Sequence, residues 1–308
     1  MHKPSSIEVF DRQLLRLRRD RAAMGIGNYD FLLRDVAARL LERMDVIKRD
    51  FPRVLDLGSH HGVLADLLKA RNGTTEVIAS DMSLRFARLT SVPAVVADEE
   101  FLPFAQDIMD AVVSNLSLQW VNDLPGALLQ IRQILKPDGL FLTAVLGGES
   151  LKELRDSLMQ AELAITGGAS PRVSPFIDMR DMGALMQRAG FALPVVDSDM
   201  ITVDYPHALK LMQDLRGMGA SNATRNRLMI PTRREVLLEA GRIYQEKYGQ
   251  KKNGNVTGRV PATFQVIYAI GWKPHQSQQK PLKPGSASIR LADALKTPEQ
   301  LTDDPAKP

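Results

Sequence analysis

The chain has 308 residues, of which 44% are hydrophobic and 25% are charged, and its formal net charge is +4. This composition excludes a wholly disordered protein, and the length suits one large domain or two small ones. The sequence contains neither Cys nor a long apolar run, which excludes disulfides, thiolate metal sites and membrane-spanning helices. The net charge is too small to predict a nucleic-acid-binding protein, and the first residues show no secretory pattern, so a cytosolic protein is expected.

Residues 7–23 are predicted to form an amphipathic helix with an apolar stripe and an arginine-rich face. The arginines of this segment are Arg12, Arg16, Arg18, Arg19 and Arg21. A mitochondrial transit peptide is one interpretation, because such segments are rich in Arg and poor in acidic residues. Asp11 and Asp20 weaken that interpretation and favour a solvated helical face. A second helix is expected over residues 29–48.

From Pro52 to Leu146, short apolar runs alternate with helical patterns. Strands are expected at residues 54–57, 76–79, 94–97, 108–114 and 140–146. Helices are expected at residues 63–71, 83–89 and 124–135, the last of them followed by a Lys-Pro-Asp-Gly turn. Strands that alternate with helices predict parallel pairing and a doubly wound α/β sheet.

The second half of the chain has a less regular pattern. Helices are expected at residues 150–165, 178–189, 208–218 and 232–248. Strands are expected at residues 193–205 and 262–272, and the last strand is expected to pair antiparallel near one edge of the sheet. From Lys273 onward the sequence has no periodicity and is rich in Pro, which predicts disorder. The chain therefore divides into N-terminal helices (1–50), a main domain (51–272) with a lid at about 150–250, and a tail (273–308).

The segment from Val54 to Gly62 carries the strongest local signal for a binding site. Its sequence, Val-Leu-Asp-Leu-Gly-Ser-His-His-Gly, predicts a buried strand, a glycine turn and the start of a helix. Backbone N–H groups at such a turn favour a nucleotide-type ligand, although the G-x-G-x-x-G and Walker patterns are missing. Asp56 lies inside the strand, so a ligand or a loop amide is expected to donate to it. An ordinary tight turn is the alternative interpretation.

Acidic residues follow the next two strands. Asp81 ends the second strand, where an acid accepts hydrogen bonds from ribose hydroxyls. Asp98 ends the third strand, in the sequence Ala-Asp-Glu-Glu-Phe-Leu-Pro-Phe. Because parallel strands end at one edge of the sheet, Asp56, Asp81 and Asp98 are predicted to converge on one crevice.

With these motifs, residues 52–146 resemble the class I S-adenosylmethionine-dependent methyltransferase fold. The resemblance implies a Rossmann-like doubly wound sheet with N-terminal helices, a helical lid insertion and S-adenosyl-L-methionine as cofactor. It implies that Gly58 and Gly62 lie under the methionine moiety, that Asp81 holds the ribose and that Asp98 and Glu99 approach the adenine. The full set of cofactor-binding residues that it implies is Asp56, Gly58, His60, Gly62, Asp81, Met82, Asp98, Glu99 and Asn115.

A narrower resemblance covers almost the whole chain. Residues 10–12, 97–104, 114–125, 174–176, 214–222 and 271–273 resemble the mitochondrial complex I assembly factor 5 family and its bacterial relatives. That family is associated with hydroxylation of an arginine on the quinone-site subunit of complex I. A more distant similarity links the same core to the malonyl-acyl-carrier-protein O-methyltransferase of biotin synthesis. The chain departs from the family at His60, where the pattern has Gly, and this side chain either contacts the ligand or faces solvent at the rim.

The residues after the fourth strand are the candidates for catalysis. Asn115 is implied to face the reacting methyl group, and Gln119 and Trp120 follow it at the mouth of the crevice. Packing against a helix is the commoner role for a residue such as Trp120. The inserted region contains three candidate lid residues, Tyr205, Met218 and Asn222.

Hydroxylation requires an oxidant, and the sequence does not predict a site for one. Of five His residues, His60 and His61 are adjacent and are expected to point apart, and no His-x-Asp or His-x-Glu is present. A metal site is therefore not predicted, and a hydroxylase activity depends on the resemblance alone.

These observations favour an S-adenosylmethionine-binding enzyme that modifies a protein side chain, by hydroxylation or methylation, during respiratory complex I assembly. The alternatives are a malonyl-acyl-carrier-protein O-methyltransferase and a non-catalytic assembly chaperone. The expected partner is a complex I subunit, docked through the arginines of residues 7–21, with peripheral contact to an anionic membrane as an alternative use of those arginines. A bacterial protein is expected in the cytoplasm, at the inner face of the membrane, and a eukaryotic one in the mitochondrial matrix. The oligomeric state is not predicted.

Overall fold

The computed structural model describes residues 8–252, 255–256, 258–279, 286 and 289–297. The chain forms two compact units, of which the first ends at Pro274 and the second begins at His275. In the described part of the second unit, residues Leu291–Leu295 form helix α10. Much of the tail that was predicted to be disordered, namely residues 280–285, 287–288 and 298–308, lies outside the described residues.

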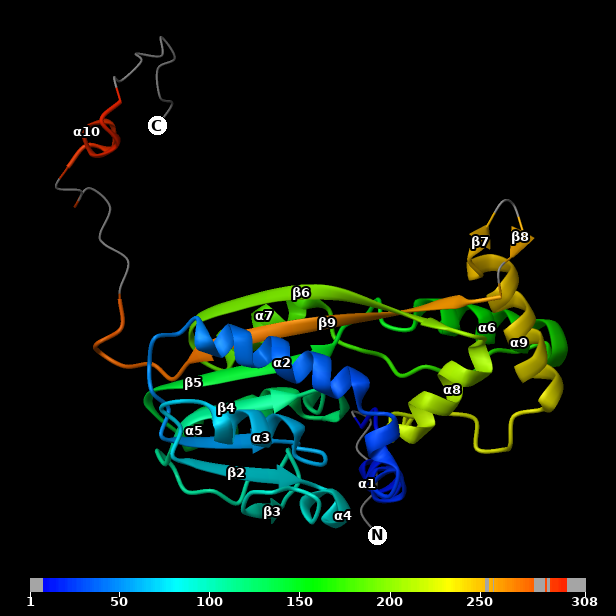
Figure 1. Cartoon of the computed structure of the whole chain (residues 1–308), viewed down its shortest axis with the longest axis horizontal. Coiled ribbons are helices and arrows are strands. Elements are labelled where there is room, and N and C mark those ends of the chain that lie inside the picture. Colours follow the sequence, from blue (N-terminus) through cyan, green and yellow to red (C-terminus); the bar gives the residue numbers. More distant parts are fainter. Residues whose placement is uncertain (1–7, 253–254, 257, 280–285, 287–288, 298–308) are drawn as a thin grey trace. The chain divides into compact units, whose positions relative to one another are not determined.

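The first unit is built on a seven-stranded sheet with the strand order β3-β2-β1-β4-β5-β9-β6 (Figure 1). Its strands are β1 (Arg53–Leu57), β2 (Glu76–Asp81), β3 (Ala94–Val96), β4 (Met109–Asn115), β5 (Leu135–Leu146), β6 (Ala192–Tyr205) and β9 (Val260–Trp272). The first five pair in parallel, whereas β9 runs antiparallel between β5 and β6. The predicted doubly wound α/β sheet and its antiparallel last strand are confirmed, and β9 lies one strand in from the edge. A separate two-stranded pair joins β7 (Lys251–Lys252) to β8 (Asn255–Val256).

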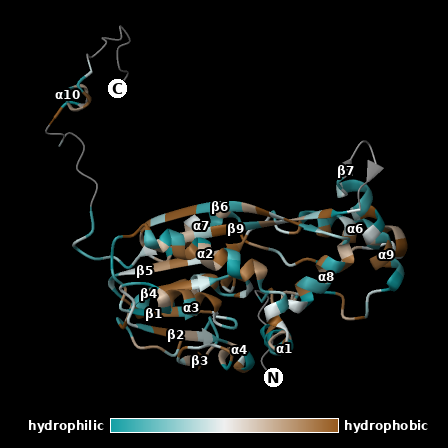
Figure 2. Ribbon diagram, in the orientation of Figure 1, coloured by the Kyte–Doolittle hydropathy of each residue, from teal (hydrophilic) through white to brown (hydrophobic). Residues whose placement is uncertain are grey.

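Helices cover both faces of the sheet, which explains why the central strands β1 and β4 and the second half of β5 are almost continuously buried, whereas the edge strand β6 alternates. The helices of the first unit are α1 (Arg12–Ala22), α2 (Phe31–Asp45), α3 (Val63–Ala70), α4 (Leu84–Ala87), α5 (Leu124–Ile134), α6 (Lys152–Thr166), α7 (Met179–Arg188), α8 (Ala208–Gly217) and α9 (Arg234–Tyr248), with short 3₁₀ turns at Ile26–Asn28 and Leu118–Trp120. Figure 2 shows apolar residues concentrated along the strands and polar residues on the outward sides of the helices. Within the described residues, no helix is long and apolar enough to cross a membrane.

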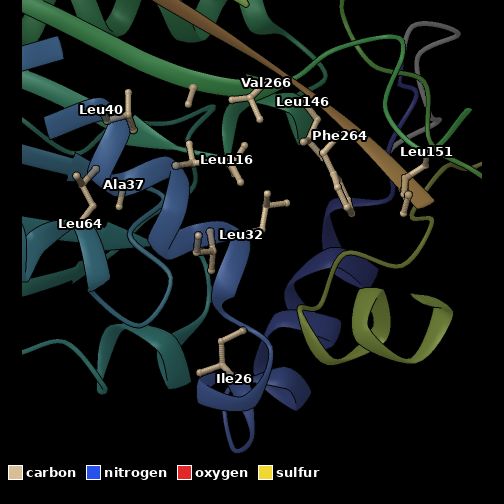
Figure 3. Packing of buried hydrophobic residues seen from close by; sticks show 14 of the residues in the cluster. Ile26, Leu32, Ala37, Leu40, Leu64, Leu116, Leu146, Leu151, Phe264 and Val266 are labelled. Atoms are coloured by element: carbon tan, nitrogen blue, oxygen red, sulfur yellow. The ribbon is translucent and has the colours of Figure 1, made fainter. Parts of the chain in front are cut away.

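The core alternates between the two faces of the sheet along each strand, as the period of two requires. On β1, Val54 packs into the core formed with α2, α3, α6 and α9, whereas Leu55 packs into the core formed with α5 and α7. Figure 3 shows part of the first core, in which Leu40 of α2 and Leu64 of α3 lie near one another and Phe264 of β9 extends it toward Leu151. The N-terminal helices share this core with the sheet, so residues 1–50 do not form a separate unit.

The fifth strand begins earlier than the sequence predicts. The expected turn after α5 is instead an irregularity inside β5, because Leu135 already pairs with Met109. The ladder shifts register between Met109 and Ala111, and Asp138 adopts a φ of +62°. The chain therefore passes from α5 into the strand without a loop.

The inserted region lies at the end of the sheet toward which the parallel strands point (Figure 1). Helix α9 packs against both α6 and α8 there. Helix α1 lies at the same end of the sheet, and it is tied to the lid by backbone hydrogen bonds. Asp11 N–H donates to Ala223 O at 2.8 Å, and Arg225 N–H donates to Val9 O at 2.8 Å.

Candidate functional site

The turn after β1 has the backbone geometry that its glycines permit. Gly58 and Gly62 adopt φ values of +71° and +91°, which L-residues with side chains rarely adopt. Gly58 also allows a close approach, because a Cβ atom at this position would lie 2.1 Å from Ser117 Oγ. Gly58 and Ser59 both donate their N–H groups to Ser80 O, at 2.7 and 2.9 Å, which joins the turn to the end of β2.

Two of the predicted acids meet at a buried arginine. Arg19 Nη1 donates to Asp81 Oδ2 at 3.3 Å and to Glu99 Oε1 at 3.2 Å, and Arg19 Nη2 donates to Ser117 Oγ at 2.9 Å. Ser117 Oγ in turn donates to Glu99 Oε1 at 2.6 Å. Asp81 and Glu99 are fully buried and Arg19 is 2% exposed. The ends of β2 and β3 therefore do form one acidic crevice, and α1 supplies its counter-charge.

A second arginine of α1 completes this ion-pair cluster. Arg12 Nη2 donates to Asp98 Oδ1 at 2.5 Å and also contacts Glu99 Oε2, while Arg12 Nη1 donates to Trp120 O at 3.1 Å. The prediction of a solvated arginine face is thus wrong for Arg12 and Arg19, although Arg16 is exposed. Arg12, Leu15 and Arg19 are spaced at i, i+3 and i+7, so the sequence did place them on one face of the helix. The pattern could not tell whether that face met solvent or buried acids.

The two buried carboxyl groups of the ion-pair cluster, Glu99 and Asp81, have pKa values shifted in opposite directions. Burial alone would raise the pKa of Glu99, but Arg12 and Arg19 outweigh it and lower that pKa to about 2. Burial raises the pKa of Asp81 to about 6, because Arg19 and the N–H groups of Ser83 and His60 offset the desolvation only in part. Glu99 is therefore a fixed anion, whereas Asp81 is the group whose charge depends on what lies against it.

Two further residues expected to bind the cofactor are Asp98, which lies at the rim of this cluster, and Met82, which is buried. The Asp98 side chain is 32% exposed and accepts from Glu100 N–H at 2.9 Å as well as from Arg12. Met82 is buried in a small apolar cluster with Phe10, Leu15 and Trp120.

Asp56 lies inside β1, and of the donors expected for it the structure tests only the protein's own. Neither of its carboxylate oxygens has a hydrogen-bond partner among the described residues, and the side chain is fully buried. Burial, with a smaller contribution from Asp81, raises the pKa of Asp56 to about 8. Its carboxyl group is therefore largely protonated at neutral pH, which avoids an uncompensated charge inside the sheet.

His60 does not face solvent at the rim. It is 8% exposed, adopts a φ of +50°, and its ring lies edge-on to Phe86 at a centroid distance of 5.7 Å. Burial, followed by Arg19, lowers its pKa to about 3, so the imidazole is neutral. Neither ring nitrogen has a partner among the described residues, whereas the backbone N–H donates to Asp81 Oδ2 at 3.0 Å.

The neighbouring His61 points elsewhere, as expected for adjacent residues. Its Nε2 lies 2.9 Å from Asp30 Oδ2, on the side of α2. Within the described part of the chain, no three His, Asp or Glu side chains are grouped as metal ligands.

The three catalytic candidates are all buried at the end of β4. Asn115 Nδ2 donates to Leu33 O at 2.9 Å, and Gln119 Nε2 donates to Leu116 O at 2.8 Å. The side-chain oxygens of Asn115 and Gln119 have no partner among the described residues. Trp120 packs edge-on against Phe10 at a centroid distance of 5.5 Å, so it has the packing role as well as its place at the crevice.

Of these three residues, Gln119 and Trp120 line a cavity of about 50 Å³ between the crevice and the lid, whereas Asn115 does not. His60, Gln119, Trp120 and Arg19 line it on the sheet side, and Met218 is among the lid residues that line it. Of the other lid candidates, Asn222 lines a second cavity of about 210 Å³ under the lid, and Tyr205 is buried in the core. Pockets for ligands of nucleoside size are commonly about 300–1,000 Å³. The cavity of about 50 Å³ is therefore smaller than a pocket of that kind.

Sequence reasoning missed Ser117, Arg12 and Arg19 as members of the site. Ser117 carried no signal of its own, because a single Ser after a strand is common in loops. The two arginines were noticed, but they were assigned to an external surface.

Comparisons with known proteins were consistent with this geometry. A family model described as a methyltransferase domain matches residues 29–194. The arginine-hydroxylase NDUFAF5, mitochondrial, of Danio rerio is 45% identical over 305 residues, which cover 96% of this chain and 92% of the relative. The malonyl-[acyl-carrier protein] O-methyltransferase of Laribacter hongkongensis is 36% identical, and the match covers 91% of this chain and 96% of the relative.

Among solved structures, phosphoethanolamine N-methyltransferase 2 of Haemonchus contortus, in complex with S-adenosyl-L-methionine, has a TM-score of 0.53 at 16% identity. The match covers 85% of this chain and 60% of that one, and at this identity it shows the shared fold alone. The expectation of a cytoplasmic location gains no support from the curated hydroxylases, which are named as mitochondrial.

Proposed function

Because the chain belongs to the NDUFAF5 arginine-hydroxylase family of methyltransferase-domain proteins, we propose that it is an S-adenosyl-L-methionine-binding enzyme that modifies an arginine side chain of a complex I subunit. The single observation that carries the cofactor assignment is the convergence of the glycine turn with Asp81 and Glu99 in one buried crevice. The identity to NDUFAF5 supports arginine as the substrate side chain.

The residues of the crevice fit this cofactor in their chemistry. Ser59 Oγ and Ser80 Oγ are buried without a partner among the described residues, beside the turn at Gly58. Asp81 is the acceptor for the ribose hydroxyls, and Asp98 at the rim is the acceptor for the adenine amino group. Gly58 and Gly62 let the backbone approach the methionine end. When bound, the cofactor would supply an electrophilic methyl group.

The chain's own residues prepare the site for a polar reaction. His60 and Gln119 both line the cavity, and neither adds net charge. The neutral imidazole has one ring nitrogen that donates and one that accepts, and the unpartnered side-chain oxygen of Gln119 accepts. Trp120 forms an apolar part of the cavity wall, and Phe10 packs against its ring. In methylation, a guanidinium nitrogen would form a bond to the methyl carbon while the carbon–sulfur bond of the cofactor breaks, so that the arginine loses one proton and S-adenosylhomocysteine leaves. In hydroxylation, one atom of dioxygen would enter the arginine side chain, and the other would leave as water with two electrons from a reductant and two protons.

A non-catalytic assembly factor is the second candidate, and one observation favours it. Arg12 and Arg19 already occupy the acids that the cofactor requires, and the cavity beside them measures only about 50 Å³. A protein that keeps α1 closed would retain the fold without turnover.

Intact-mass analysis of complex I subunits, from cells with and without the gene, tests the reaction. A subunit that gains one oxygen with the gene supports hydroxylation, and a gain of one methyl group supports methylation. An unchanged set of masses, together with failed complex I assembly in the deletion strain, supports the non-catalytic candidate. A methyl ester on malonyl-acyl-carrier protein, with normal complex I, would support the malonyl-carrier methyltransferase instead and would contradict the proposal.

A further inference from the structure

A basic groove lies between α1 and α8, outside the crevice. We use this name for the hollow of about 630 Å³ lined by Arg18, Arg21, Ala22, Gly25, Tyr29, Gln213, Arg216, Gly217 and Ser221. Three of these residues are arginines, and none is acidic. The groove is therefore a concave surface with one sign of charge, which concentrates anions.

Two of the three arginines are available to a ligand. Arg21 and Arg216 are exposed, and neither makes an ion pair or a side-chain hydrogen bond within the described residues. The acids closest in sequence to them have other partners. Asp20 accepts from Ser83 Oγ at 2.5 Å, and Asp214 is paired with Lys210 at 2.5 Å.

The third arginine fixes one wall of the groove. Arg18 is half-buried, and its Nη1 donates to Ser221 O at 2.8 Å and also to Asn222 O. Burial and the neighbouring charge of Arg227 lower the pKa of Arg18, and the charge of Asp11 offsets them only in part, so the positive charge lacks full compensation. An anion in the groove would supply that compensation.

The floor of the groove is rigid. The Tyr29 ring packs so closely on Gly217 that a Cβ atom there would lie 2.5 Å from ring carbons. Lys210 Nζ lies 5.6 Å from the centroid of the same ring. Since Tyr29 is engaged in these contacts, its ring is not a free stacking platform for a nucleic-acid base.

The groove adjoins the functional site through the lid. Ser221 lines both the groove and the cavity of about 210 Å³ under the lid, and Gly219 and Ala220, next to it in sequence, line the crevice cavity. Arg18 and Arg19 are adjacent on α1, so this helix forms a wall of the groove and also supplies the crevice with its counter-charge. A ligand held in the groove would therefore lie against the same segment, residues 219–221, that lines both cavities.

We propose that the basic groove binds an acidic segment of the protein substrate, whose carboxylate side chains pair with Arg21 and Arg216. The guanidinium fork matches a carboxylate with two parallel hydrogen bonds, and Arg is the residue best suited to such pairs. A concave hollow with two available cations favours a short acidic peptide over a membrane, which needs a convex or flat basic surface. The description of the partner as the substrate rests on the proposed function, whereas the binding of an acidic peptide does not.

The docking role that was expected for all the N-terminal arginines is limited to those that face the groove. Arg12 and Arg19 are unavailable because they hold the crevice acids, and Arg18 and Arg21 face the groove. The same helix therefore uses one face for the site and another for the partner.

The test uses the full-length protein and a short fluorescein-labelled peptide rich in glutamate, with fluorescence anisotropy as the readout. The Arg21→Glu, Arg216→Glu double variant should weaken peptide binding at least about tenfold, and the salt dependence should flatten. The matched control is Arg16→Glu with Arg88→Glu, which changes the net charge equally at exposed positions outside the groove. This control should bind the peptide about as well as the wild type.

Equal weakening by both double variants would overturn the proposal, because the effect would then come from net charge alone. Binding to anionic vesicles that depends on Arg21 and Arg216, without binding to the peptide, would also overturn it in favour of a membrane. Calorimetry with S-adenosyl-L-methionine on the same variants keeps the two proposals separate. Normal peptide binding by a protein that does not bind the cofactor would contradict the proposed function alone.

Discussion

Replacement of Arg19 by Gln tests the central feature of the site, the buried ion-pair cluster under α1. The side chain is 2% exposed and donates to Asp81, Glu99 and Ser117 at 3.3, 3.2 and 2.9 Å. Removing one partner of a buried ion pair commonly costs about 3–5 kcal/mol. Glu99 keeps Arg12, and Asp81 keeps two backbone N–H donors, so we expect a loss near the lower end, about 3 kcal/mol.

Urea unfolding measures this loss, and Arg16→Gln is the matched control. Arg16 lies on the exposed face of the same helix, so its replacement should change the unfolding free energy by no more than about 0.5 kcal/mol. Equal effects of the two variants would show that Arg19 does not make the buried pairs in solution.

The same substitution is expected to lower the stability of the fold but to raise its affinity for the cofactor. Arg19 and a ribose would compete for Asp81, and a hydrogen bond to a charged group contributes about 1.5–3 kcal/mol. The Arg19→Gln variant should therefore bind S-adenosyl-L-methionine about 10- to 100-fold more tightly, as measured by calorimetry. Weaker binding would refute this reasoning and would show that Arg19 itself contacts the cofactor.

Three further variants test single residues of the crevice. Asp81→Ala should lose about 1–3 kcal/mol of cofactor affinity in calorimetry, since the ribose donors would be left unpaired, and unchanged affinity would contradict the ribose assignment. The pKa of Asp56 is raised from 3.8 to about 8, so the wild type should lose stability as the pH rises from about 4 to about 8. Asp56→Asn should remove that loss in urea unfolding. A variant whose stability falls with pH in parallel with the wild type would contradict this prediction. His60 has a pKa lowered from 6.5 to about 3, so its contribution to stability is present above pH 6.5 and is lost as the pH falls toward 3. His60→Gly should reduce this loss of stability at low pH, as measured by urea unfolding. It should retain cofactor binding, because the backbone N–H that donates to Asp81 remains. A loss of stability as steep as that of the wild type would show that other groups take up the protons.

The sequence by itself determined the architecture and most of the crevice. Apolar runs of strand length that alternate with helical patterns predict a parallel sheet with helices on both faces, because buried strands lose their polar alternation. The glycine turn at Gly58 and the acid at Asp81 follow consecutive strands, so their meeting at one edge of the sheet is a consequence of parallel pairing. Local periodicity and spacing carry this information, and the structure has these residues together.

The partners of the buried charges were decided only by the tertiary structure. Arg19 reaches acids that are 62 and 80 residues away in the chain, and an amphipathic pattern assigns any arginine to solvent unless such a partner is known. The same limit applies to Asp56 and His60, whose burial depends on what packs over the turn and not on their neighbours in sequence. A charge is stable inside a protein only when a distant residue compensates it, and that compensation is set by long-range packing, which local sequence patterns do not record.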